Sequence, residues 1–371
     1  MPKKETNKFQ SIIIDQLKPY DVLMPELIKT AANIKNEAED FLLEDVPEAA
    51  IEIDYDNNLT FSEFPGSRKT FQTTENSLRQ LCEKLTIPFS FYQKLQNSPN
   101  FNKEKKEIAK NLVEELSMYY KFPKARGLMI RTYKKLIRAV LSNSYSIFDS
   151  DKITQMTDDC IKNSIFHTKD LMIGSYINDF ERFQVRIIHT DPLHMDNDET
   201  IYCGLTIESS DIGNAKLATS FYIYEDLQSN GISIDANPYA NEKLYSQIHI
   251  GTDPQKIEKG LTTALEKFPD MKENIKSYLN KATQTDLTKS GLYNPKSYNG
   301  RHMMKELELS GKDIDEFMKI VEQRPKTLKD YIMAISQFAR QCRTEKRCFL
   351  EKMAGKILLH PDHYGIRKEN E

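Results

Sequence analysis

The chain has 371 residues, 39% of them hydrophobic, which is enough to bury a sizeable core and predicts two or three domains. Its formal net charge of −3 argues against a protein coated all over by nucleic acid, so any contact with nucleic acid must be local. The five cysteines are odd in number and include no Cys-x-x-Cys pair, which favours reduced thiols in a cytoplasmic protein over a disulfide framework.

The N-terminal segment is charged, and its apolar run is limited to residues 12–14, so no signal peptide is expected. No uncharged apolar run approaches the length of a membrane span, which predicts a soluble protein without membrane contact. Residues 1–70 are expected to form an N-terminal helix and hairpin segment. The hairpin is predicted where residues 51–53 alternate in polarity and residues 59–61 return after a polar turn.

Residues 71–120 are predicted as a helical segment. Apolar residues at i, i+3 and i+7 indicate a helix that begins after Thr74, a suitable N-cap. Pro88 ends this helix, a second helix follows at 89–95, and a third is expected over 103–120. The first two helices carry too few cations for a DNA-reading module, so they are expected to pack on a sheet.

A basic strip, defined as residues 116–148, contains seven cations and no Asp or Glu. Cations hold phosphates and interleaved aromatic rings stack on bases, so such a strip is typical of a groove for single-stranded nucleic acid. The alternative is a structural ribbon with rings packed inward and lysines extending into water. The candidate nucleic-acid contacts are Lys121, Lys124, Arg126, Arg131, Tyr133, Lys134, Lys135, Arg138 and Tyr145.

Within the basic strip, two short apolar runs flank Lys134 and Lys135 and predict a β-hairpin with these lysines at its tip. In that register Arg131 faces Arg138 on one side of the hairpin. Like charges at facing positions destabilise a sheet unless an anion lies between them. The pair is therefore either a phosphate clamp or two guanidinium groups that extend into water, and charge reversal at either one is expected to abolish binding without unfolding.

Residues 121–252 are predicted as an antiparallel core, because runs rich in β-branched and aromatic residues follow one another with few helices between them. A helix capped by Asp149 or Ser150 precedes these runs. The expected strands are residues 170–176, 182–190, 201–208, 215–224 and 231–234. The chain is therefore predicted to be α+β, with a central, mostly antiparallel sheet, flanking helices and a helical C-terminal region.

Two polar segments join these strands and are candidate ligand sites. Residues 189–199 hold two His and four carboxylates, and His189, Asp191 and His194 are weak candidates for a divalent metal. Acidic residues also solubilise a long hairpin loop, so neither a metal nor another cofactor is predicted. In residues 208–214, an anion-binding turn is a second possibility beside a plain turn. Its candidate residues are Ser209, Ser210, Gly213 and Asn214.

Residues 253–371 are predicted as the helical C-terminal region. Asp253 and Pro254 mark the start of its first helix. Polar residues 283–300 are expected to form a linker. The expected helices are residues 256–267, 271–282, 311–322 and 328–357.

Short motifs across residues 70–360 resemble a family of phage-, prophage- and plasmid-encoded proteins of unassigned function. Residues 73–92 are similar to its helical entry, residues 137–145 to its RAVLSxxY core, and residues 204–215 to its G-x-x-I-x-N-S-E-x-G segment. Ser229-Asn-Gly231 is similar to its C-T-N-G step and Ile248-His-Ile-Gly251 to its I-x-H-I-G step. Residues 334–339 and 350–355 resemble its closing helices.

The chain departs from that family at Gln228 and Ser229, which replace Cys and Thr, and at Asp211, which replaces Glu. The missing cysteine argues against a thiol mechanism. Neither a Gly-rich phosphate loop nor a GxSxG elbow is present in the sequence, which disfavours an ATP-driven motor and a serine hydrolase. The resemblance implies a cytoplasmic protein of a mobile element.

Three functions follow from these patterns. The first is binding of nucleic acid, most simply single-stranded DNA or RNA, by the basic-aromatic hairpin in replication or recombination, with a possible homo-oligomer. The second is a protein–protein interaction that counters host defence, in which a host protein is the partner. The third is a metal-dependent nuclease. The sequence favours a binding protein over an enzyme.

Overall fold

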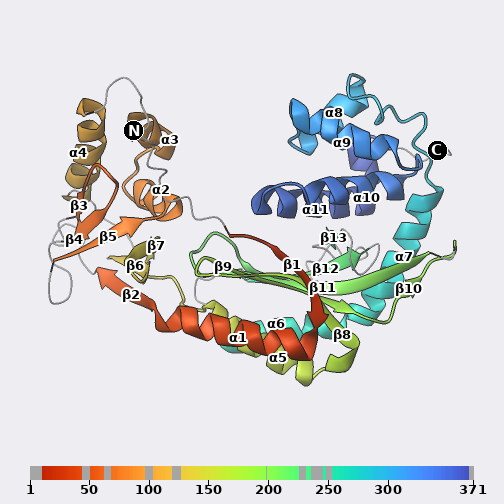
Figure 1. The fold of residues 1–371 in the computed structure, drawn as a ribbon, viewed down its shortest axis with the longest axis horizontal. Coiled ribbons are helices and arrows are strands. Elements are labelled where there is room, and N and C mark those ends of the chain that lie inside the picture. The colour runs from red at the N-terminus through yellow and green to blue at the C-terminus, as the bar shows by residue number, and fades with distance from the viewer. Residues whose placement is uncertain are drawn as a thin grey trace.

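A computed structural model describes residues 11–43, 51–61, 68–96, 103–118, 127–197, 199–224, 231–234, 245–247 and 253–366. These residues form eleven α-helices and two mostly antiparallel sheets. The predicted α+β class with a helical C-terminal region is therefore confirmed. Figure 1 shows the small sheet and its helices on one side, the large sheet in the centre, and the C-terminal helices on the other side.

The large sheet has the strand order β1-β8-β9-β11-β12-β13, and β10 and β14 pair with β11 and β12. All of these pairs are antiparallel. The expected strands are all present, with ends shifted by a few residues. The strands are Ile14–Pro19 (β1), Leu171–Asn178 (β8), Arg182–His189 (β9), Leu193–His194 (β10), Thr200–Ser210 (β11), Leu217–Tyr224 (β12), Gly231–Ile234 (β13) and Tyr245–Gln247 (β14).

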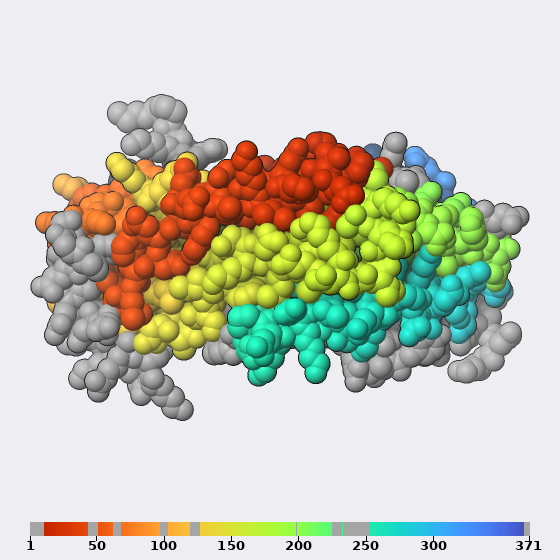
Figure 2. Space-filling view, turned by 90° about the horizontal axis from the view of Figure 1, so that it is seen from below, coloured from red at the N-terminus to blue at the C-terminus, as the bar shows by residue number. Residues whose placement is uncertain are grey.

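One face of the large sheet is apolar and forms the main core of the protein. Alternate residues such as Val185, Leu205 and Phe221 point into this core, as the two-residue period of a strand requires. Helices α1 (Tyr20–Asn36), α5 (Ser150–Lys162) and α6 (Pro254–Glu266) belong to the same core. Figure 2 shows these three helices side by side across the underside of the molecule.

The remaining C-terminal helices are packed together beside and above the large sheet (Figure 1). They are α7 (Phe268–Gln284), α8 (Tyr298–Glu306), α9 (Lys312–Glu322), α10 (Leu328–Ala339) and α11 (Thr344–Leu359). The single helix expected over residues 328–357 is wrong, because the chain turns at residues 340–343 and α11 runs back along α10. Helix α8 also begins inside the expected linker.

The small sheet has the strand order β2-β6-β7-β5-β4-β3, and only the β5–β7 pair is parallel. Helix α2 is capped by Thr74 as predicted, because Thr74 Oγ1 accepts a hydrogen bond from the Ser77 amide. The strands are Ala38–Leu43 (β2), Ile51–Ile53 (β3), Leu59–Phe61 (β4), Lys69–Thr73 (β5), Leu128–Tyr133 (β6) and Leu136–Ser142 (β7). The helices are Glu75–Lys84 (α2), Phe89–Gln96 (α3) and Glu104–Met118 (α4).

The residues of the small sheet are inserted in the chain between the first and second strands of the large sheet. Strand β1 of the large sheet comes first, all six strands of the small sheet follow, and β8 then pairs with β1. The boundaries expected at residues 70 and 120 fall inside the span of the small sheet. The chain therefore passes between the two sheets twice, once after α1 and once after β7.

The five cysteines are free thiols, and all except the half-buried Cys342 are buried. Cys82 and Cys203 pack as small apolar groups. Their burial raises the pKa of both thiols to about 12, so they stay protonated at neutral pH. In the part of the chain that the structure describes, no helix is both long and apolar enough to cross a bilayer.

Candidate functional site at the joint between the sheets

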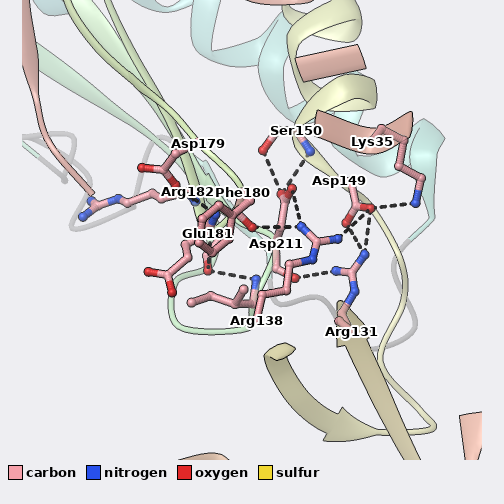
Figure 3. A network of polar contacts seen from close by, with 12 residues as sticks. Lys35, Arg131, Arg138, Asp149, Ser150, Asp179, Phe180, Glu181, Arg182 and Asp211 are labelled. Atoms are coloured by element: carbon pink, nitrogen blue, oxygen red, sulfur yellow. Dashed lines mark hydrogen bonds and ion pairs between the residues drawn. The ribbon is translucent and has the colours of Figure 1, made fainter. Parts of the chain in front are cut away.

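The hairpin β6–β7 brings Arg131 and Arg138 to the joint between the two sheets (Figure 3). A bulge between Arg131 and Thr132 pairs Arg131 with Ala139, so the two arginines are not directly opposed. Both side chains are nevertheless in one network of polar contacts. Their exposed fractions are 0% and 1%, so the joint is an interior site.

Arg131 is held by three segments that are far apart in the sequence. Its Nε donates to Asp40 Oδ1 at 2.8 Å, and its Nη2 donates to both carboxylate oxygens of Asp149 at 2.7 Å. Its Nη1 donates to the backbone carbonyl of Asp211. Every nitrogen of this guanidinium group therefore has a partner, and such charge-assisted bonds are the strong ones.

Arg138 joins the same carboxylates from the neighbouring strand. Its Nη1 donates to the carbonyl of Phe180 at 2.9 Å and contacts Asp211 Oδ2 at 3.4 Å. Its Nη2 lies 3.6 Å from Asp149 Oδ2. Lys35 approaches Asp149 from the rim at 2.9 Å, so Asp149 receives three cations.

The expectation that Arg131 and Arg138 form a phosphate clamp or extend into water is corrected by this burial. The anion between them is the carboxylate of Asp149, which belongs to the same chain. As a result, Asp149 is the N-cap residue of α5 but makes no side-chain capping bond. Reversing either arginine charge would place like charges together in the interior, so such variants are expected to unfold rather than only lose a ligand.

The pKa values of the two buried carboxyl groups of the joint are shifted in opposite directions. Burial disfavours ionisation of Asp149, but the charges of Arg131 and Arg138 outweigh that effect and lower its pKa. Asp211 is wholly buried, and burial together with the neighbouring charge of Asp149 raises its pKa. Asp211 Oδ1 accepts hydrogen bonds from the amide and the hydroxyl of Ser150 at 3.0 and 2.8 Å.

The turn between β8 and β9 supplies two more carboxyl groups beside the joint. Burial, followed by the charge of Asp179, raises the pKa of Glu181 to about 8. Burial also raises the pKa of Asp179, although the amides of Glu181 and Arg182 each donate to its carboxylate at 2.9 Å. Perturbed carboxyl groups gather at functional sites and also in structural networks, and here the nearby cations are Arg138 and Arg182.

The three longest motifs of the family resemblance meet at this joint. From the RAVLSxxY segment, Tyr145 Oη donates to the Ser210 carbonyl at 3.1 Å. From the helical entry segment, Gln80 Nε2 donates to the Ile212 carbonyl at 2.7 Å, and Gln80 Oε1 accepts from the Val140 amide at 2.9 Å. The motifs therefore coincide with the residues that fix the small sheet on the large one.

The turn proposed as an anion site is closed by its own side chain. Ser210 Oγ accepts from the amides of Ile212 and Asn214 at 3.3 and 3.2 Å and donates to the Glu181 carbonyl at 3.2 Å. Ser209 is buried, whereas Gly213 is exposed and adopts φ +75°, a conformation that favours glycine. Two amides that would bind an anion are thus already paired.

Among the described cations of the basic strip, those that face solvent lie at the hairpin tip. Lys134 and Lys135 are exposed, and the ring of Tyr133 stacks on Phe180 with centroids 4.8 Å apart. Lys134 Nζ lies 5.1 Å from the centroid of the Tyr133 ring and 3.0 Å from Glu37 Oε2. Tyr145 is buried in the joint. The other predicted contacts, Lys121, Lys124 and Arg126, lie outside the described residues.

The loop between β9 and β11 directs its acidic groups toward lysines of the C-terminal helices. Asp191 pairs with Lys272 at 2.6 Å, which lowers the Asp191 pKa. Burial and the charge of Lys272 lower the pKa of His189. His194 is exposed. Within the described ranges, no group of three His, Cys, Asp or Glu side chains is arranged to hold a metal ion.

Comparisons with known proteins give the chain no relative. No family model, no curated protein and no solved structure matches it. The resemblance to phage and plasmid proteins therefore stays a prediction from the motifs.

Proposed function

We propose that this protein binds nucleic acid, most simply single-stranded DNA, through the tip of the β6–β7 hairpin. One observation carries the proposal: Tyr133 stacks on Phe180 while Lys134 and Lys135 project into solvent beside it. Aromatic rings and lysines are the two components of a sequence-tolerant binding groove. A base that stacked on Tyr133 would take the place of the Lys134 ammonium group, which would then be released to a phosphate.

Rigidity of the tip supports the same function. Arg131 and Arg138, in the strands just behind the tip, anchor the hairpin to the start of α5 through Asp149 and to the end of β11 through Asp211. The two arginines thus position the contact residues without touching the ligand themselves. A hairpin tip that is fixed in this way loses little conformational entropy when single-stranded nucleic acid binds.

The cellular setting of the proposal depends on the motifs alone. The resemblance to phage, prophage and plasmid proteins suggests the cytoplasm of a host cell and a role in replication or recombination of a mobile element. Oligomerisation along a single strand would fit such a role.

The first experiment is fluorescence anisotropy of a labelled single-stranded oligonucleotide over a series of salt concentrations. A groove that engages roughly four to seven phosphates gives a slope of log K against log salt of about −3 to −5. Lys135→Glu and Tyr133→Ala should each weaken binding, and Lys135→Glu should also reduce the slope by about 1. Lys29→Glu, an exposed lysine on α1, is the matched control and should bind like the parent.

Two results would overturn the proposal. One is the absence of binding at low salt by a protein that circular dichroism shows to be folded. The other is binding that Lys135→Glu and Lys29→Glu weaken equally, because a non-specific charge effect would then explain it. Adding Mg²⁺ or Mn²⁺ to the same samples, with and without chelator, tests the nuclease alternative.

A protein partner is the second candidate function. The exposed fractions of Ile12 and Ile14, at the edge of the large sheet, are 71% and 44%. Exposed aliphatic side chains beside an edge strand are a common basis for protein contacts. Folded protein that binds no nucleic acid would direct the search to host proteins that contact this edge.

A further inference from the structure

The face of the large sheet that is turned away from α1, α5 and α6 is polar. On β9 it carries Arg182, Gln184 and Arg186, because these residues alternate with the apolar residues of the core face. On β11 and β12 it carries Thr206, Glu208, Ser220, Tyr222 and Tyr224. This composition is that of a surface, although most of these side chains are buried.

Helix α11 covers this polar face mainly with charged groups. Glu351 pairs with Arg186, and Lys352 pairs with Glu208 at 2.7 Å. The apolar residues of α11, such as Leu350 and Ile357, belong to the main core of the protein, and the helix packs along α10. A polar contact of this kind is easier to separate than an apolar one, since water and ions replace its partners.

Several buried polar atoms under α11 have no hydrogen-bond partner among the described residues. They are the Nε atoms of Arg182 and Arg186, the Oγ1 of Thr206 and the hydroxyl of Tyr222. The Arg186 guanidinium carbon lies 4.4 Å from the centroid of the Tyr222 ring. Most buried polar groups in proteins are paired, so these atoms, like Nε of Arg138 at the joint, are hydrogen-bonding groups that a ligand could use.

The tyrosines of this face continue toward the surface. Tyr222 and Tyr224 form a small cluster with Ile188, and the half-buried Tyr202 and Met172 pack against it. The Tyr224 hydroxyl lies 2.9 Å from the position that a Cβ on residue 174 would occupy, and residue 174 is glycine. Tyr202 and Met172, which are half-buried, therefore mark the border of the buried patch.

We propose that this polar, tyrosine-bearing face is a second contact surface for single-stranded nucleic acid and that α11 is its cover. In the covered state Glu351 neutralises Arg186. In the open state a phosphate takes the place of that carboxylate, and bases stack on Tyr202, Tyr222 and Tyr224. A sheet face with aromatic and arginine side chains binds unstacked bases in this way. The inference rests on the proposed function, because it assumes that the protein binds nucleic acid.

Photo-crosslinking of the full chain to an oligo(dT) that contains iodouracil tests this inference. Peptide mapping by mass spectrometry is expected to show crosslinks at Tyr202, Tyr222 or Tyr224 in addition to those at Tyr133. If the protein binds the oligonucleotide but crosslinks only at Tyr133, the cover proposal is wrong and the proposed function stands. If no binding is found by anisotropy, both are wrong.

A second measurement uses Glu351→Gln, which removes the carboxylate charge but keeps the shape of the side chain. The open state should become more populated, so the affinity for the oligonucleotide should rise about three- to tenfold, and amides of β9 and β11 should exchange hydrogen faster. Glu316→Gln, exposed on α9, makes the same charge change and should have neither effect. Unchanged affinity and exchange in folded Glu351→Gln would contradict the cover role. The crosslinking of the unaltered chain decides the question if this variant does not fold.

Discussion

Arginines are buried at two places in the described part of the protein, at the joint and under α11, and they are held differently. At the joint, Arg131 uses all three guanidinium nitrogens in bonds to Asp40, Asp149 and a backbone carbonyl. Under α11, the partner of Arg186 is one residue, Glu351, and its Nε has no hydrogen bond among the described residues. Arg138 is intermediate, since it has two carboxylate neighbours, but its Nε and Nη2 make no hydrogen bond within the described ranges.

Under the cover proposal, this difference separates a permanent contact from one that opens. Breaking the joint would require several charge-assisted bonds, donated by different chain segments, to be lost together. Lifting α11 exchanges the one carboxylate of Arg186 for water or another anion, and it also opens the ion pairs of Lys352 with Glu208 and of Arg347 with Asp15. Buried charge alone therefore does not tell which interface is fixed, whereas the number of independent partners does.

The largest expected effect is the loss of Arg131. Arg131→Leu leaves Asp40 and Asp149 without their main partner in a buried site, so the free energy of unfolding should fall by about 3 to 5 kcal/mol. Urea denaturation followed by circular dichroism measures this change. Lys135→Leu, at the exposed hairpin tip, should change stability by less than about 0.5 kcal/mol. Equal effects of the two substitutions would show that the joint is not a network.

The next largest effect is seen when one partner of a buried ion pair is removed and then both partners are removed, under α11 and at the joint. Glu351→Leu alone should destabilise the protein by about 3 kcal/mol, and adding Arg186→Leu should restore most of that loss, because Arg347, which also loses Glu351, keeps its pair with Asp15. At the joint, adding Asp149→Leu to Arg131→Leu should restore much less, since Asp40 and the Asp211 carbonyl still lack their donor. Thermal unfolding measures the stability that each double variant regains. If it is similar at both sites, the two sites are not held differently.

A smaller effect concerns pH and the carboxyl group of Glu181, which faces Asp179, Glu345 and Arg138. Its pKa is raised from 4.5 to about 8, so the folded state binds more protons than the unfolded state between these values. Stability contributed by the protonated group is therefore lost as the pH rises from about 4.5 to 8.

Glu181→Gln should remove that slope and be more stable than the parent at pH 9 by about 1 to 3 kcal/mol. The two proteins should differ little at pH 4.5. Melting temperatures across this range provide the measurement, and parallel curves for parent and variant would contradict the expectation.

The smallest effect distinguishes paired from unpaired hydroxyls. Tyr145→Phe removes the bond to the Ser210 carbonyl at the joint and should cost about 1 kcal/mol. Tyr222→Phe removes a buried hydroxyl without a partner among the described residues, so stability should be unchanged or slightly higher. A clear loss in Tyr222→Phe would mean that this hydroxyl is paired and would weaken the cover proposal.

Periodicity and capping signals predicted most of the fold. The two-residue alternation in residues 182–190 and the Thr74 cap act locally, so they can be read from neighbours in the chain. The break at residues 340–343 contains neither glycine nor proline, and packing of α11 along α10 decides it. Packing of this kind leaves no local signal.

The candidate site could be predicted only in part. The sequence indicated that Arg131 and Arg138 would be neighbours, but their partners Asp40, Asp149 and Asp211 lie 91, 18 and 73 positions away from the arginines they bind. Burial of Arg131 had one local signal, because Ile130 beside it is completely buried and apolar residues flank Arg138 as well. A basic residue in a strand with apolar neighbours can therefore indicate an internal ion pair as readily as a ligand contact.

The pairing of β1 with β8 has a consequence for the timing of synthesis. Roughly 150 residues separate these strands, and a ribosome adding about 5 to 20 residues per second needs about 8 to 30 seconds to make them. During that interval the whole small sheet can form, while β1 remains unpaired because β8 has not yet been synthesised. Delayed partners of this kind expose aggregation-prone strands, so the nascent chain is expected to depend on chaperones until β8 leaves the ribosome.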